Sequence, residues 1–374
     1  MAFFVGYGCI GILPLLQLKL LWRFAPVEII GNVLFVATFS VVISTFCDGN
    51  LSYKAVSAKE SAEISNSLLG TYKVRFARLI LLAPLAVLLF QFKGASILTS
   101  ISIVLLSAAY LLNYAYIYRN SGSVAKALFG DFTLRALCQL CPVFGALLWG
   151  KNSGLVTGCL CAFLIQLIVV KTRFRIKAAS AYPNFRAAIS RDLFSGLLGL
   201  TYSSFCQTVS ALVLSSEQFA RFVSVDRLVR AGLLVTEPCR LWFLRQSWIQ
   251  SSEFALGRIF AASLMVATAS FLAVVMIFVS GLARYILHTG LSSPMYLGVS
   301  FFVSFVSFFT LCAFVRYNFI VVVNGILQVA IVLGAIAYWL LLGKGPFTAS
   351  FAFEGVACLV VVAGSMLAKY SREA

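Results

Sequence analysis

The sequence is poor in charged residues and above all in histidine. Of its 374 residues 11% are Asp, Glu, Lys or Arg, acidic residues number 12, and His288 is the single histidine. In a soluble domain about a quarter of all residues are charged, and these residues cover its surface. This chain has too few of them to face water on all sides. A soluble globular protein is therefore excluded, and lipid is expected to be the solvent for most of the chain.

The sequence also lacks motifs on which many enzymes and metal sites depend. It has no Gly-rich phosphate-binding loop, so we do not expect ATP hydrolysis. Ten cysteines are present, and Cys138-Gln-Leu-Cys141 has the spacing of a zinc or redox pair. No second ligand pair accompanies it, so we interpret the cysteines as small buried apolar residues. We expect no metal, no cofactor and no enzymatic activity.

Long apolar runs make up most of the chain, of which 61% is hydrophobic. A run of about 20 residues spans the hydrocarbon core as a helix, whereas membrane barrels show short alternating segments. We therefore predict an all-α, polytopic membrane protein with about twelve transmembrane helices, the first retained rather than cleaved as a signal peptide. The expected spans are 2–22, 29–47, 75–92, 95–117, 127–149, 153–170, 190–214, 225–248, 258–280, 294–315, 318–342 and 350–369.

Basic residues are distributed unevenly between the loops. The net charge is +17, and with both termini inside, eighteen Lys and Arg fall on the cytoplasmic side against six outside. This bias predicts cytoplasmic termini by the positive-inside rule. The basic residues form short clusters between apolar runs rather than one basic face, so we expect no nucleic-acid partner.

A basic polar stretch near the middle divides the chain in two. We predict an N-terminal six-helix lobe over 1–170, a basic cytoplasmic linker over 171–189 and a C-terminal six-helix lobe over 190–374. Each lobe has a similar helix entry, in which Glu28 or Glu217 lies three residues before a small residue. Equivalent positions in two such lobes would be related by an axis along the membrane normal.

Charged residues inside the predicted spans are the candidate site residues, because a charge in hydrocarbon is costly. The span at 225–248 is the richest, and its arginines share one helical face. They either line a wet cavity, where the guanidinium fork suits phosphate, or extend to the membrane interfaces. The pair in the span at 127–149 is either part of the same site or an internal ion pair. The candidates are Asp226, Arg227, Arg230, Glu237 and Arg240 in the first span and Asp131 and Arg135 in the second.

Three motifs, taken in order, carry a resemblance to a known family. They are Phe24-Ala25-Pro26-Val27-Glu28-Ile29-Ile30-Gly31-Asn32-Val33, Cys47-Asp48-Gly49-Asn50-Leu51-Ser52, and the run from Phe222 to Arg240. With the six-plus-six plan, the chain resembles the oligosaccharide-lipid and polysaccharide flippases of the multidrug/oligosaccharidyl-lipid/polysaccharide exporter superfamily, and O-antigen flippases in particular.

The resemblance implies alternating access in the bacterial cytoplasmic membrane. The cargo would be a polyprenyl-pyrophosphate-linked oligosaccharide for surface polysaccharide assembly, with membrane lipids, a polysaccharide polymerase and other assembly proteins as partners. Arginines at the site suit this anionic cargo. Two alternatives stay open, a cation or drug antiporter of the same superfamily and a membrane-embedded glycan polymerase or ligase.

Overall fold

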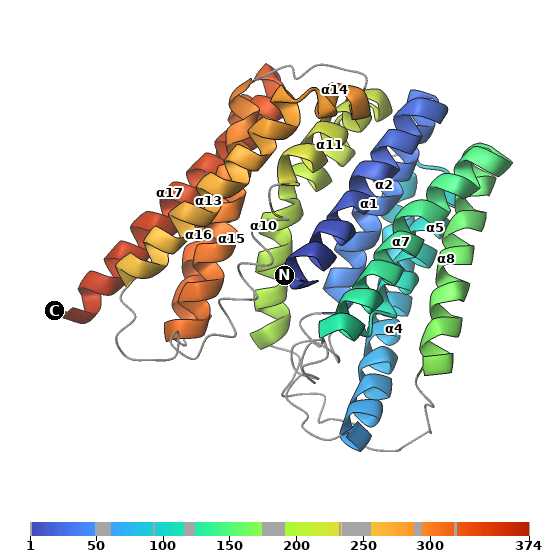
Figure 1. Ribbon diagram of the computed structural model, residues 1–374, viewed down its shortest axis with the longest axis horizontal. Coiled ribbons are helices and arrows are strands. Elements are labelled where there is room, and N and C mark those ends of the chain that lie inside the picture. Colours follow the sequence, from blue (N-terminus) through green and yellow to red (C-terminus); the bar gives the residue numbers. More distant parts are fainter. Residues whose placement is uncertain are drawn as a thin grey trace. The chain divides into compact units, whose positions relative to one another are not determined.

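The computed structural model describes residues 2–48, 61–92, 94–115, 124–173, 191–231, 233, 256–287, 294–317 and 320–373. In these ranges the regular structure is helical, without strands (Figure 1). The helices are α1 (Ala2–Phe24), α2 (Val27–Asp48), α4 (Ser61–Phe92), α5 (Ile97–Leu111), α7 (Val124–Trp149), α8 (Lys151–Arg173), α10 (Arg191–Val213), α11 (Ser216–Arg230), α13 (Leu256–Val279), α14 (Leu282–Leu287), η3 (Pro294–Leu297), α15 (Gly298–Tyr317), α16 (Ile320–Leu341), η4 (Leu342–Lys344) and α17 (Pro346–Glu373).

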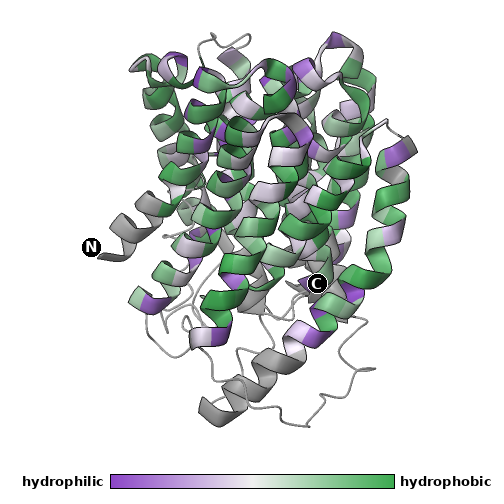
Figure 2. Cartoon of the chain, turned by 90° about the vertical axis from the view of Figure 1, so that its right-hand side faces the viewer, coloured by the Kyte–Doolittle hydropathy of each residue, from purple (hydrophilic) through white to green (hydrophobic). Residues whose placement is uncertain are grey.

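The helices have the length and surface of membrane spans. By length and composition six of the described helices can cross a membrane, namely α2, α7, α8, α13, α16 and α17, and α5 is a shorter apolar helix. Apolar residues run along the helices in Figure 2, and large ones such as Leu81, Leu340 and Leu359 are more than two-thirds exposed. Since such side chains avoid water, this surface fits lipid. The chain is an all-α, multi-pass membrane protein.

The predicted spans overlap the observed helices, with two corrections at helix starts. The helix predicted at 225–248 begins nine residues earlier, at Ser216. Ser215 Oγ accepts a hydrogen bond from the Gln218 N–H, and the Gln218 side-chain oxygen accepts one from the Ser215 N–H, both at 3.3 Å. This reciprocal cap starts the helix in a polar stretch that hydropathy does not detect. Helix α4 likewise begins at Ser61, ahead of the expected position 75.

The chain forms two compact units. Unit 1 comprises Met1–Leu200 and Gln207–Ala220, and unit 2 comprises Thr201–Cys206 and Arg221–Ala374. The predicted lobe boundaries at 170 and 190 stay a prediction, because 174–190 lie outside the described residues.

In unit 1, α7 packs along α8, α8 along α5, and α5 along α2, while α1 packs against α7 (Figure 1). The crossing of α7 and α8 is made by glycines. A side chain at Gly158 would meet the backbone of Cys141 and Pro142, and one at Gly145 would meet the backbone of Gly154 and Gly158. Small residues let two membrane helices approach this closely.

Unit 2 is built on two long helix pairs, α16 with α17 and α13 with α15, with α15 also packing against α17. Its interior is aromatic. The Phe205 and Phe353 rings stack with centroids 4.8 Å apart, and Tyr338 meets Phe205 edge-on at 5.6 Å. Because these rings are contributed by α10, α16 and α17, they hold residues 201–206 of α10 within this unit.

Candidate functional site

A buried network of charged side chains lies in unit 2. Arg230, in the last turn of α11, donates from Nε to both carboxylate oxygens of Asp226, one turn earlier, at 3.0 Å. Its Nη2 donates to Glu354 Oε1 of α17 at 2.7 Å. One guanidinium thus bridges two carboxylates from different helices, an arrangement that its planar fork allows.

Two tyrosines also belong to this network. Tyr202 of α10 donates its hydroxyl proton to Glu354 Oε2 at 2.6 Å, and Tyr296 of η3 donates to Asp226 Oδ1. The side chains of Asp226 and Glu354 are 0% exposed, and that of Arg230 is 11% exposed. We call these five residues, Tyr202, Asp226, Arg230, Tyr296 and Glu354, the unit 2 charge network. Every carboxylate oxygen in it accepts at least one hydrogen bond, as buried charges require.

A second polar cluster lies in unit 1, at the C-terminal end of α2. Arg75 of α4 is 1% exposed and donates from Nε to Asp48 Oδ1 at 2.6 Å and from Nη1 to the Leu111 carbonyl at 3.1 Å. Arg78 donates from Nη1 to the Cys47 carbonyl at 2.9 Å. Cations at a helix C-terminus complement its dipole. This cluster fastens the end of α2 to α4 and α5.

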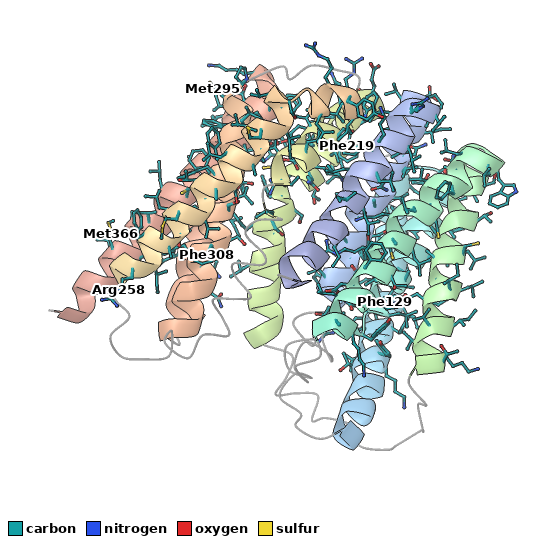
Figure 3. All side chains as sticks on the ribbon, viewed as in Figure 1. Phe129, Phe219, Arg258, Met295, Phe308 and Met366 are labelled. Atoms are coloured by element: carbon teal, nitrogen blue, oxygen red, sulfur yellow. The ribbon has the colours of Figure 1, made fainter. Side chains whose placement is uncertain are left out.

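The two candidates in α7 have different surroundings. Asp131 is 4% exposed, whereas Arg135, one turn later, is exposed. Arg135 lies eleven residues after Val124 in a helix of 26 residues, so it is about 17 Å along the helix axis and close to its middle. Phe129, labelled in Figure 3, and Phe132 are exposed on the same helix. The side chain of Arg135 is thus exposed near the middle of an apolar helix.

The structure therefore brings some of the predicted candidates together. Asp226 and Arg230 bind each other, Arg227 is half-buried on the same helix, and Glu237 and Arg240 lie outside the described residues. Which of the seven candidates contacts a cargo stays a prediction.

Sequence reasoning missed Glu354, Tyr202, Tyr296 and Arg75 as site residues. Glu354 had a usable signal, since it is a lone acid inside the apolar run 350–369. The tyrosines had none, because they are 70 and 152 positions from their partners.

The cysteine pair Cys138 and Cys141 lies on α7, and both thiols are free. Cys138 is buried and Cys141 half-buried. Among the described residues, no three His, Cys, Asp or Glu side chains are grouped so as to hold a metal ion.

These features define a class, a multi-pass helical membrane protein with ionised groups held inside its helical units. Its fold is similar to that of the lipid II flippase MurJ in an inward closed conformation, with a TM-score of 0.63 and 14% identity over 98% of this chain and 87% of that one. A MATE transporter of Vibrio cholerae matches with a TM-score of 0.52 and 13% identity over 99% and 94% of the two chains.

No protein-family profile and no curated protein sequence matches the chain. The likeness to these structures shows the fold, which is of the kind that the resemblance in the motifs implied. The solved structures that it matches are a lipid II flippase and MATE proteins.

Proposed function

We propose that this chain moves the anionic headgroup of a polyprenyl-pyrophosphate-linked oligosaccharide across the bacterial cytoplasmic membrane, for surface polysaccharide assembly. Both termini would lie in the cytoplasm. A polysaccharide polymerase and other assembly proteins would receive the cargo.

The observation that carries the proposal is the exposed guanidinium of Arg135 near the middle of α7. Exposing an arginine to lipid at the bilayer centre costs at least about 2.5–3.5 kcal/mol on insertion scales. A water-filled cavity removes this cost, and an anionic cargo that enters the cavity gives the guanidinium a partner. A pyrophosphate suits this partner because the arginine fork donates to two oxygens at once.

The fold comparison supports the same cargo class. The chain is more similar to a lipid II flippase, with a TM-score of 0.63, than to the MATE transporters, at 0.50 to 0.52.

The experiment reconstitutes the full chain in vesicles that hold a fluorescent polyprenyl-pyrophosphate-linked oligosaccharide, and follows the appearance of the sugar on the opposite leaflet. We expect Arg135→Gln to lower the flipping rate at least about tenfold, the equivalent of one lost interaction of 1.4 kcal/mol. Arg135→Lys should recover part of it, because Lys keeps the charge and loses the fork.

The matched control is Arg258→Gln. Arg258 is exposed at the start of α13 (Figure 3), so its loss removes one exposed positive charge away from the middle of a helix. Equal flipping rates for wild type, Arg135→Gln and Arg258→Gln would contradict the assignment of Arg135 to the cargo path.

A second candidate function is cation-coupled drug transport, and one observation favours it. Asp226 and Glu354 are fully buried carboxylates in a membrane helical unit, and such groups can exchange cations. Export of a cationic dye from the same vesicles, together with no movement of the lipid-linked sugar, would select this candidate over the flippase.

A further inference from the structure

The side of α7 around Arg135 carries three side chains of different chemistry. Phe132 lies three residues before Arg135 and Gln139 four residues after it, so all three fall within about 60° of one another around the helix axis. Along the axis they are about 4.5 Å and about 6 Å from Arg135, on either side of it. Phe132 is exposed and Gln139 half-buried. An aromatic ring, a guanidinium and a carboxamide therefore share one face of this helix.

Gln139 has a buried acceptor without a donor. Its side-chain oxygen Oε1 has no hydrogen-bond partner among the described residues. Its main-chain carbonyl, by contrast, accepts a hydrogen bond from Gln17 Nε2 of α1 at 3.1 Å. An unpartnered buried acceptor lowers stability, so the carboxamide does not serve the packing of α1 on α7. The last torsion of a Gln side chain is broad, and Oε1 can therefore turn toward a donor that enters beside Arg135.

Together the three groups fit a sugar phosphate better than a lipid acyl chain. Phe132 alone would suit hydrocarbon, but a guanidinium and a carboxamide on the same arc would not. A pyranose ring has an apolar face of C–H groups and a rim of hydroxyls. The C–H face can lie on the negative face of an aromatic ring, and the hydroxyls can bind a carboxamide, which both donates and accepts.

We propose that Phe132, Arg135 and Gln139 form a subsite for the sugar joined directly to the pyrophosphate of the cargo. Arg135 binds the pyrophosphate, Phe132 lies against the face of the sugar, and Gln139 binds one of its hydroxyl or amide groups. This inference rests on the proposed function and adds which part of the glycan is recognised. One oxygen separates the first sugar from the pyrophosphate, so side chains one turn from Arg135 reach it. The subsite thus favours a carrier lipid that holds a sugar over the same lipid without one.

The test measures binding rather than transport. The full chain in lipid nanodiscs is titrated with two short-chain probes, a prenyl pyrophosphate that carries one N-acetylated sugar and the same prenyl pyrophosphate without the sugar. We expect the wild type to bind the sugar-bearing probe about tenfold more tightly, from one ring contact and one hydrogen bond. Phe132→Leu, which keeps an apolar side chain without the flat ring, and Gln139→Leu should each reduce that preference about threefold. Arg135→Gln should weaken both probes by the same factor.

The matched control is Phe144→Leu. Phe144 is also exposed on α7, but it is nine residues from Arg135 and therefore on the opposite side of the helix. Its replacement should leave both affinities unchanged. A second readout separates recognition from a structural role at Gln139. Because Gln139→Leu removes an unpartnered buried acceptor, its unfolding free energy should not fall, although its sugar preference does.

The outcomes separate this inference from the proposed function. Equal wild-type affinities for the two probes would overturn the sugar subsite, as would a preference that both Phe132→Leu and Gln139→Leu retain in full. Wild-type affinities for both probes in Arg135→Gln would instead contradict the assignment of Arg135 to the cargo path. No binding of either probe to the wild type would reject both. The wild-type comparison decides even where a variant does not fold.

Discussion

The buried pair of Arg75 and Asp48 gives the sharpest prediction of stability. Arg75→Gln removes two donors to Asp48 and one to the Leu111 carbonyl. Removing one partner from a buried ion pair costs about 3–5 kcal/mol. Because Asp48 is 23% exposed, water compensates part of its loss, so we expect the lower end, about 3 kcal/mol. At 1.4 kcal/mol per factor of ten, that lowers the folding equilibrium constant more than about 100-fold.

The assay is reversible unfolding of the purified chain in mixed micelles with increasing sodium dodecyl sulfate. Lys73→Gln is the matched control, because Lys73 lies in the same turn of α4 and is exposed; it should change the unfolding free energy by less than about 0.5 kcal/mol. The double variant Asp48→Asn, Arg75→Gln should be more stable than Arg75→Gln, since it no longer leaves a carboxylate without its cation. If Arg75→Gln lowers the unfolding free energy by no more than Lys73→Gln does, the reasoning is refuted.

Two further predictions concern packing and topology. Gly158→Leu should destabilise the chain by about 1–3 kcal/mol in the same titration, because the new side chain meets the backbone of α7. The control Gly325→Leu places its side chain in open space and should leave the unfolding free energy unchanged. Equal effects of the two variants would show that α7 and α8 are not tightly packed. A cysteine placed at Ser180, in the predicted cytoplasmic linker, should resist a membrane-impermeant thiol reagent applied to intact cells, whereas one at Lys344 should react. Labelling of the Ser180 variant from outside, above the level of the parent chain, would reverse the predicted orientation.

Hydropathy was sufficient to predict where the apolar parts of the helices lie. A membrane span must satisfy its own backbone hydrogen bonds and present apolar side chains to lipid, so its signal is local in the chain. The predicted spans were wrong at the helix starts where this apolar signal is absent. The polar first turns of α11 depend on the Ser215–Gln218 cap, and the start of α4 at Ser61 precedes its apolar part.

The candidate site was predicted only in part. Arg230 stood out because it is an arginine inside an apolar segment, and Asp226 because it lies one turn away on the same helix. The arginines of this helix were expected either to line a wet cavity or to extend to the membrane interfaces. The structure shows that Arg230 is paired with Asp226 and with Glu354, which is 124 positions further along the chain.

The sequence by itself determined the class of the molecule, since scarce charges and long apolar runs leave lipid as the solvent and helices as the spanning elements. The tertiary structure decided how the remaining charges are balanced. Electrostatic energy depends on distances between groups, and no local pattern reports that Tyr202, Asp226, Arg230, Tyr296 and Glu354 converge.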